Sequence, residues 1–402
     1  MMLHFRVLSY ATLKMFMTSF YNGVIECASL ILAFRTGATR SRFIKSYYDF
    51  IGEQEYYLRI IYMKAAVYRV GKGLVVEEVP KPRIEADQML VKVSHTGFCG
   101  TDHSMISSGG LTDGTIIGHE TCGVVVETGN LAKTLPEGTR VIVRPTSCGV
   151  CPDCQSGKPY FCQNNRRSIG IGDLPGAFAE YITVYPEMLI PVPDKVDPQN
   201  AALAESFATS LHAITSSRKQ KGSALVVGGG PIGLALVSLL KMLEFHPILL
   251  SEPVIEKRDM GLVFGADLVM DPLSEDLSQK VFAGTEGRGC EVVFECSGVP
   301  SLIQTCMDAA ARGGTVCMVS MTFAATEISP MTLNFKEIWL TGCYSNTHAE
   351  NIQCLNWMAE GKLDGRPLIS DLISLDELPG VYEKRIDTGQ AIKVMLKIGD
   401  PF

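Results

Sequence analysis

The sequence predicts an α/β protein in which a doubly wound parallel sheet of the Rossmann type is joined to a second part that binds zinc. Three observations carry this prediction. Apolar, β-rich runs alternate with helical runs between residues 224 and 342, which is the pattern of a parallel sheet covered by helices. The first of these runs ends in a glycine-rich loop, and four cysteines lie close together between residues 148 and 162.

Composition limits the kinds of partner that we expect. The chain has 402 residues, 46% of them hydrophobic, which is enough for two domains with sizeable cores. Its net charge is −7 and it has no basic stripe, so nucleic acid is not an expected partner. The longest apolar stretch, residues 24–34, is interrupted by Glu26 and is too short to span a bilayer. We therefore expect no membrane partner either.

The first 62 residues differ in composition from the rest. Residues 1–62 hold 13 of the 32 aromatic residues, no proline and a net charge of +3, whereas the remainder carries −10. The favoured interpretation is upstream sequence translated by mistake, with Met63 the true start, because a strand is predicted at residues 63–68. A transit peptide is the second interpretation, since no acid precedes Glu26. A membrane anchor is the third. We expect this extension not to be part of the fold.

Downstream of the first predicted strands lies a group of residues typical of a catalytic metal site. His119 follows Cys99 by twenty residues, and Glu120 and Glu205 offer carboxylates. A thiolate, an imidazole and a carboxylate are ligands of catalytic zinc, which keeps one position open for water or substrate. The sequence leaves open whether Glu120 or Glu205 is the third protein ligand. Zinc at this site would lower the pKa of a bound alcohol, so that hydride can leave it near neutral pH.

Two residues beside Cys99 are expected to support this site. A ligating imidazole usually donates its other N–H to a carboxylate, and Asp102 is placed to accept that bond from His119. The hydroxyl of Thr101 is expected to hydrogen-bond the substrate oxygen and take its proton. The alternative for both residues is a simple turn after a strand.

The spacing C-x2-C-x2-C-x7-C predicts a second metal site. Four thiolates close all four positions of a tetrahedral zinc ion, which makes such a site structural. A disulfide pair and a thioredoxin-like dithiol are the alternatives. Disulfides fit poorly with 13 cysteines, an odd number, and no convincing secretory signal, and we expect a cytoplasmic protein. A redox dithiol does not need the other two cysteines. The predicted ligands are Cys148, Cys151, Cys154 and Cys162.

The glycine-rich loop predicts a dinucleotide site. It follows a buried strand at residues 224–227 and opens an apolar helix, the context that a G-x-G-x-x-G pattern requires. A second strand, at residues 247–251, ends at Glu252, 19 residues after the last glycine. A carboxylate there binds ribose hydroxyls and repels a 2′-phosphate, which favours NAD over NADP; the alternative is an ordinary carboxylate at a helix start. The expected cofactor contacts in the loop are Gly228, Gly230, Ile232 and Gly233.

Further alternating runs complete the predicted parallel sheet. A helix is expected from Ser301. The remaining strands are predicted at residues 268–271, 290–296, 315–321 and 338–342.

With these motifs in place, residues 63–402 resemble the zinc-containing medium-chain dehydrogenases/reductases, the alcohol dehydrogenase superfamily. The resemblance is closer to the sorbitol and threonine dehydrogenase branch than to classical alcohol dehydrogenases. It covers about 340 of the 402 residues, and its motifs are specific in combination. Several elements match in order: Gly-Phe-Cys99-Gly-Thr-Asp, Gly-His119-Glu120, the cysteine lobe, the segment Gly176–Tyr181, Ala-Glu205 and the glycine loop.

The resemblance implies a domain organisation and a cofactor contact. Residues 63–206 would form a GroES-like catalytic domain, completed by residues 344–402, and residues 207–343 would form the Rossmann NAD-binding domain. Lys393 falls where the family places a basic residue on the cofactor pyrophosphate. The family also implies a homo-oligomer, either a dimer or a tetramer.

The sequence departs from the family pattern at three positions. Many members carry a proton-relay histidine five residues after the zinc cysteine, where this chain has Ser104, with His103 one place earlier. This leaves open how protons leave the site. Classical alcohol dehydrogenases have a zinc-binding cysteine where Glu205 stands, and Ser206 replaces the proline that usually follows.

These observations predict an enzyme that binds two zinc ions per subunit and NAD. It would oxidise a secondary hydroxyl of a small-molecule alcohol, namely a polyol, sugar or hydroxy-amino acid. The substrate itself cannot be identified from the sequence, because pocket residues come from several loops. A zinc-free quinone or enoyl reductase on the same frame is one alternative, although such enzymes lack the cysteine lobe and the Cys99/His119 pair. A non-catalytic NAD-binding protein is the other.

Overall fold

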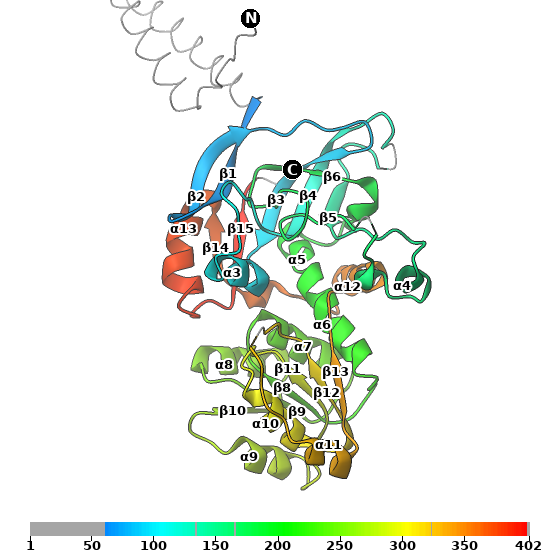
Figure 1. Cartoon of the computed structure of the whole chain (residues 1–402), viewed down its shortest axis with the longest axis vertical. Helices are drawn as coiled ribbons and strands as arrows, with labels where there is room; N and C mark the ends of the chain where they lie inside the picture. The colour runs from blue at the N-terminus through cyan, green and yellow to red at the C-terminus, as the bar shows by residue number, and fades with distance from the viewer. Residues whose placement is uncertain (1–60, 133–134, 165, 323, 400–402) are drawn as a thin grey trace, which may run out of the picture.

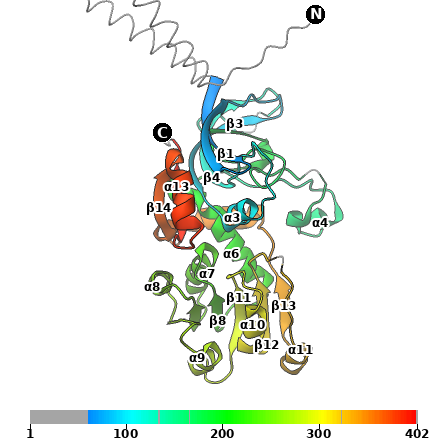
Figure 2. The same ribbon diagram turned by 60° about the vertical axis from the view of Figure 1, so that its left-hand side comes forward.

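The computed structural model describes residues 61–132, 135–164, 166–322 and 324–399, which form a β-rich domain and an α/β domain (Figure 1). The α/β domain lies at one end of the molecule, and the first and last described segments of the chain lie together in the β-rich domain. A lobe that contains the short helix α4 (Pro152–Gln155) projects from the side of the β-rich domain in both views (Figure 2).

The α/β domain is built on six parallel strands, as the alternating pattern predicted. Their order is β10-β9-β8-β11-β12-β13, so β8, which precedes the glycine loop, lies in the middle of the sheet. Strands β8 and β9 are wholly buried, because helices cover both faces of the sheet, whereas the edge strands β10 and β13 are partly exposed. Their bounds are β8 (Ala224–Val227), β9 (Ile248–Ser251), β10 (Leu268–Met270), β11 (Cys290–Glu295), β12 (Ala310–Met318) and β13 (Trp339–Gly342).

The helices of this domain follow the strands in turn and bury their apolar sides against the sheet. Two separate apolar clusters result, one on each face, which is the layered arrangement of a doubly wound fold. The helices are α7 (Pro231–Met242), α8 (Ile255–Phe264), α9 (Leu277–Gly284), α10 (Leu302–Ala309) and α11 (Pro330–Lys336).

The β-rich domain is centred on a seven-stranded sheet of order β14-β15-β3-β4-β5-β7, with β6 also paired to β3. Its first two strands come from the C-terminal part of the chain, so this domain is discontinuous in sequence. A separate two-stranded sheet, β1 (Tyr62–Arg69) with β2 (Gly73–Pro80), packs beside it. The other bounds are β3 (Met89–Gly97), β4 (Glu120–Thr128), β5 (Arg140–Val143), β6 (Tyr181–Val184), β7 (Leu189–Pro191), β14 (Ile369–Ser374) and β15 (Lys393–Lys397).

Three helices lie in the two connections between the domains. The chain leaves the β-rich domain through α5 (Pro198–Ala202) and α6 (Ala204–Ser216) and returns through α12 (His348–Ala359). Helix α6 packs against both α7 and α12, so the outgoing and returning segments lie side by side. The remaining helical segments are α3 (Gly100–Ser107), α13 (Leu378–Val381), the π-helix Tyr382–Ile386 and 3₁₀ turns at Pro159–Phe161, Pro186–Met188, Arg366–Leu368 and Leu375–Glu377. No helix in the described ranges is long and apolar enough to cross a membrane.

The strand boundaries differ from the sequence-based prediction by up to five residues, and two of these differences involve contacts between segments. Strand β1 begins at Tyr62 rather than Met63, and the carbonyl of Ile61 accepts a hydrogen bond from the Lys81 amide at 2.9 Å. The last two residues of the predicted extension therefore contact the fold, while residues 1–60 lie outside the described part. Strand β12 begins at Ala310, five residues early, because Ala310 pairs with Cys290 across an irregularity in the β11–β12 ladder.

Replacing His95 on β3 by leucine should remove an acid-sensitive part of the stability. Burial, reinforced by Lys397, lowers the pKa of this imidazole from 6.5 to about 4. The unfolded chain then binds the proton more readily, so the folded state loses stability as the pH falls through this window. Between pH 6.5 and 4, the free energy of unfolding of wild type should fall by about 2–3 kcal/mol more than that of His95→Leu.

Urea-unfolding midpoints of the two proteins across this pH range would measure the difference. Acid-sensitive zinc ligands are common to both proteins and cancel in the comparison. Parallel pH profiles would contradict the assignment.

Candidate active site and zinc sites

The start of helix α3 positions the first two expected site residues. Cys99 is the N-cap of α3, and its Sγ accepts a hydrogen bond from the Thr101 amide at 3.4 Å. The carboxylate of Asp102 reaches back to the Cys99 amide at 3.0 Å, which completes a capping box. Cys99 is therefore fixed by the helix start itself, and its thiol lies at the positive end of the helix.

Asp102 also faces His119, which comes from the loop before β4. Its Oδ1 lies 3.3 Å from Nδ1 of His119, and the Asp102 side chain is fully buried. Burial opposes protonation of His119, but the charges of Asp102 and Cys99 outweigh it and raise the histidine pKa. The loop turns at Gly118, where φ is +99° and a Cβ atom would lie 2.6 Å from the Phe178 ring, so only glycine fits.

Glu120 is held by a buried ion pair. Nζ of Lys393, on β15, lies 2.6 and 2.8 Å from its two carboxylate oxygens, and both side chains are 1% exposed. Each charge offsets the desolvation of the other, which keeps the pKa of Glu120 low and that of Lys393 high. The hydroxyl of Ser206 donates a further bond to Glu120 at 2.9 Å. The contact of Lys393 with a pyrophosphate therefore stays a prediction.

Glu205, in the first turn of α6, is held differently. Its Oε1 accepts a hydrogen bond from the Asn346 amide group at 2.9 Å and from the Thr209 hydroxyl at 3.3 Å. Burial and the nearby charge of Glu120 raise the pKa of Glu205. Asn346 belongs to the returning connection between the domains, so Glu205 is fixed by both connections.

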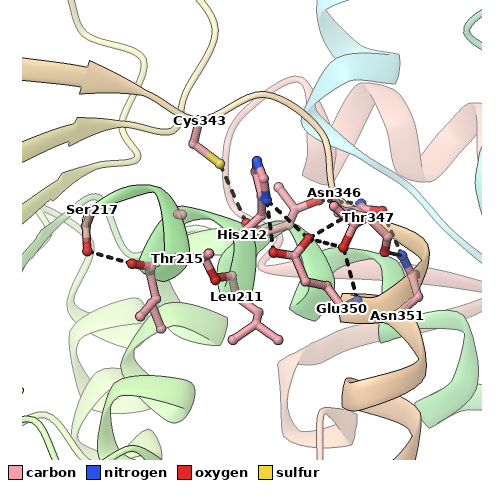
Figure 3. A network of polar contacts seen from close by, with 12 residues as sticks. Leu211, His212, Thr215, Ser217, Cys343, Asn346, Thr347, Glu350 and Asn351 are labelled. Carbon is pink, nitrogen blue, oxygen red and sulfur yellow. Dashed lines mark hydrogen bonds and ion pairs between the residues drawn. The ribbon is translucent and has the colours of Figure 1, made fainter. Parts of the chain in front are cut away.

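A polar network extends this contact along one side of α6 (Figure 3). His212 Nδ1 lies 2.9 Å from a Glu350 carboxylate oxygen, and Glu350 in turn caps α12 through Thr347. Asn351, fully buried, donates to the side chain of Asn346 at 2.7 Å. Glu205, Thr209 and His212 are spaced by about one helical turn, so all three face the returning segment that contains Asn346 and Glu350.

The donor set of the first site fits a zinc ion. Ligand atoms of Cys99, His119 and Glu120 all lie within 4.8 Å of one another. One thiolate, one imidazole and one carboxylate match catalytic zinc, and Nδ1 of His119 faces Asp102, so Nε2 is the atom left for a metal. Glu205 is not part of this group, although it lies near enough to feel the charges of Glu120 and His119.

The four cysteines of the lobe also converge. Their sulfur atoms all lie within 4.8 Å of one another, with Sγ–Sγ distances of 3.9 Å (Cys148–Cys154) and 3.4 Å (Cys151–Cys154). A tetrahedral site with zinc–sulfur bonds of about 2.3 Å has sulfur atoms about 3.8 Å apart, whereas a disulfide needs about 2.05 Å. Amide donors from Val150 and Cys151 lower the pKa of Cys148 to about 6, which favours the thiolate that zinc binds.

The glycine loop has the form that a dinucleotide requires. Gly228 has φ of +103°, and a Cβ atom on Gly233 would collide with the Gly228 carbonyl oxygen. Gly230 is extended and N-caps α7, and no atom lies within 4 Å of where its Cβ atom would be. The backbone at Gly230 is thus open to the approach of a phosphate, and the contact of Ile232 with the cofactor stays a prediction.

Glu252 lies against this loop. It follows β9, and its carboxylate accepts hydrogen bonds from the Gly229 amide at 2.6 Å and the Val254 amide at 2.9 Å. Because β9 neighbours β8, the carboxylate is at the edge of the loop, where the ribose of a bound dinucleotide would lie.

Several residues were not anticipated from the sequence. The hydroxyl of Ser104 donates to the Gly100 carbonyl within its own helix, at 3.0 Å, while Nδ1 of His103 lies 3.2 Å from the Tyr382 hydroxyl. Ser206 and Asn346 hold the two carboxylates, and neither was predicted. The unusual serine after Glu205 was the one available signal; nothing in the sequence marks Asn346.

Comparison with known proteins agrees with this geometry. The family model described as "Alcohol dehydrogenase GroES-like domain" matches residues 85–194, and that described as "Zinc-binding dehydrogenase" matches residues 231–360. The chain belongs to the zinc-binding alcohol dehydrogenase superfamily and is an oxidoreductase of the type that acts on CH–OH groups.

The relatives share almost their full length with this chain. The 2-dehydro-3-deoxy-L-galactonate 5-dehydrogenase of Pseudoalteromonas atlantica is 32% identical over 83% of the chain and 98% of the relative. The sorbitol dehydrogenase of Bacillus subtilis is 28% identical over 83% and 97%.

Solved structures of zinc-binding dehydrogenases and related enzymes have the same fold as this chain. A putative zinc-binding dehydrogenase from Sinorhizobium meliloti, bound to NADP, is 32% identical with a TM-score of 0.77, covering 84% of this chain and 99% of that one. The L-idonate 5-dehydrogenase of Escherichia coli is 27% identical with a TM-score of 0.76, over 84% and 99%.

Replacing Cys151 by serine should open the cysteine lobe. A closed structural site contributes folding free energy, so we expect one zinc ion fewer per chain, a lower melting temperature and a lower soluble yield. Metal analysis and thermal unfolding would measure these effects. Cys296→Ser, which changes a partly buried cysteine outside both sites, is the matched control and should keep the wild-type zinc content. Unchanged zinc content in Cys151→Ser would show that the lobe does not bind the metal.

Proposed function

We propose that this protein is a zinc- and NAD-dependent dehydrogenase that oxidises a secondary hydroxyl of a polyol, sugar, sugar acid or hydroxy-amino acid. The convergence of Cys99, His119 and Glu120 within 4.8 Å, in a chain that also has an open glycine loop, carries this proposal. The names of the relatives, which include sorbitol and threonine dehydrogenases and dehydrogenases of sugar acids, support this substrate range.

Each site residue has a distinct task in this proposal. Zinc held there would supply Lewis-acid polarisation of a hydroxyl oxygen, and the nicotinamide would accept the hydride. Cys99 and His119 would hold the metal together with one carboxylate. Asp102 would fix the orientation of His119 by accepting the N–H of the ring nitrogen that faces away from the metal. Thr101, one residue before Asp102 on α3, would accept a hydrogen bond from the substrate hydroxyl and take up its proton as its own hydroxyl proton moves on towards solvent.

The third protein ligand is best assigned to Glu120. Its carboxylate lies within the same group of donors as Cys99 and His119, whereas Glu205 is anchored to Asn346 and Thr209. Lys393 bonds both carboxylate oxygens of Glu120, so its ammonium group would have to release one of them if a metal bound there. Glu205 would then remain a neighbouring anion that orients groups around the metal.

The alternatives account for fewer of these contacts. A zinc-free quinone or enoyl reductase has no use for four converging cysteines or for a cysteine and a histidine that face each other in a buried site. A non-catalytic NAD-binding protein has no need for Asp102 to orient His119. Two zinc ions per chain would therefore favour the dehydrogenase.

The same proposal includes a cytoplasmic homo-oligomer, either a dimer or a tetramer. The described cysteines are free thiols, which suits a reducing compartment. The edge strand β13 exposes Trp339 and Leu340, with exposed fractions of 61% and 39%, and an unpaired apolar edge suits pairing with a second chain.

Replacing Cys99 by serine should abolish turnover with little effect on the fold. A serine hydroxyl can still cap α3, but it is a poor zinc ligand, so the catalytic zinc should be lost or bound far more weakly. We expect one zinc ion fewer per chain, an unchanged Kd for NADH and a kcat reduced by roughly a thousandfold or more. Metal analysis, NADH fluorescence titration and steady-state kinetics with a polyol and sugar-acid panel would test this. Retention of most activity would rule out Cys99 as a catalytic ligand.

Glu252 should decide between NAD and NADP. Its carboxylate repels a 2′-phosphate, so kcat/KM with NAD should exceed that with NADP by roughly 10-fold or more. Glu252→Ser should narrow this ratio. Because a relative is bound to NADP, the measurement is decisive: a wild-type preference for NADP would overturn the assignment.

A further inference from the structure

Arg144 is a buried cation for which the described part of the chain provides no side-chain partner. It follows β5 directly and is 8% exposed, and its Nε is enclosed without a hydrogen-bond partner. No residue in the described ranges donates or accepts a hydrogen bond with its guanidinium, and none forms an ion pair with it. Burial, reinforced by the charge of Arg166, lowers the pKa of Arg144 to about 10.

Other arginines of this protein are treated differently. Arg69 bonds the carboxylates of Glu77 and Asp113, and Arg167 pairs with Asp173 at 2.5 Å. Both are more exposed than Arg144, so they need a partner less. An unpaired buried charge costs stability. A buried guanidinium without an anion therefore indicates a place that an anion from outside the chain fills.

The neighbours of Arg144 add positive charge. The guanidinium of Arg166 donates to the Tyr160 carbonyl, the Tyr344 hydroxyl and Ser345 Oγ, at 3.0, 3.2 and 3.4 Å. These acceptors are all neutral, so they leave its charge uncompensated. His348 lies near enough to Arg144 that burial and the arginine charge together lower its pKa.

The chain connects this cluster to the candidate active site. Ser345, which accepts a hydrogen bond from Arg166, directly precedes Asn346, which holds Glu205. Two residues further along the same segment lies His348, whose pKa is affected by the charge of Arg144. The returning segment between the domains is therefore shared by the cluster and the site.

We propose that Arg144, with Arg166 and His348 beside it, is an oxyanion subsite that binds the carboxylate of an acidic substrate, a sugar acid rather than a neutral polyol. This inference rests on the proposed dehydrogenase function. A guanidinium presents its N–H groups in a planar fork that matches two carboxylate oxygens. A neutral substrate would leave the buried charge unpaired, so the subsite selects against it.

The test compares wild type with Arg144→Met on three classes of alcohol: aldonates such as gluconate, the matching neutral polyols such as sorbitol, and polyol phosphates. Wild type should prefer aldonates. Arg144→Met should lower kcat/KM for aldonates by roughly 10- to 100-fold, the loss expected for charge-assisted hydrogen bonds, and should change that for polyols by less than about threefold. Arg144→Lys should retain an intermediate preference, because it keeps the charge but not the fork.

Stability and binding measurements keep the test decisive. Arg144→Met removes an unpaired buried charge, so its melting temperature should equal or exceed that of wild type. Arg167→Met, which removes a neighbouring arginine already paired with Asp173, is the matched control and should leave the aldonate preference unchanged. Calorimetric titration of the zinc-loaded protein with gluconate and with sorbitol measures the subsite without turnover.

The outcomes separate the two proposals. If Arg144→Met lowered kcat/KM equally for aldonates and polyols, or if wild type preferred neutral polyols, only the oxyanion subsite would be overturned. A wild-type preference for polyol phosphates would support an oxyanion subsite but show that its ligand is a phosphate and not a carboxylate. A wild type that oxidises no member of the panel but binds gluconate through Arg144 would overturn the proposed reaction and keep the subsite; absence of both turnover and binding would overturn both.

Discussion

The buried ion pair between Lys393 and Glu120 is the contact on which the arrangement of the site depends. It joins β15, near the C-terminus, to the first residue of β4, and Ser206 at the start of α6 bonds the same carboxylate. Three segments that are distant in sequence therefore meet at one carboxylate. Removing one partner of such a buried pair typically costs about 3–5 kcal/mol, because the other charge is left without compensation. The pair thus fixes the carboxylate beside His119 and the C-terminal strands on the sheet.

The second connection between the domains is organised around polar groups as well. Helix α6 presents Glu205, Thr209 and His212 to the returning chain, where Asn346 and Glu350 meet them. Buried polar groups that are fully bonded specify one geometry more sharply than apolar contacts do. Glu205 is therefore supported by both connections and Glu120 by Ser206 of the outgoing one. Arg144 differs from both carboxylates, because no described residue forms a hydrogen bond or an ion pair with its guanidinium.

Local motifs of this protein could be predicted from the sequence. The four cysteines span fifteen residues, so their spacing alone brings four sulfur atoms within reach of one ion. The glycine loop is likewise defined by a short strand, a turn and a helix start. Alternating apolar runs predicted the parallel sheet, because strands buried on both faces need continuous apolar segments. The discontinuous β-rich domain was expected from a family resemblance, and the pairing of β15 with β3 shows it directly.

What the sequence determined by itself was therefore the local chemistry: the cysteine lobe, the glycine loop, and Cys99, Asp102 and His119 as a group within about twenty residues. Only the tertiary structure decided the rest. Glu120 lies with Cys99 and His119 while Glu205 is held by Asn346, and Lys393 is bonded to a carboxylate 273 residues away. Arg144 is buried with no anionic partner among the residues that the structure describes. These facts depend on contacts between segments that have no fixed spacing in the chain. A single sequence carries no periodicity or motif that records such contacts, because they arise only when strands and helices pack.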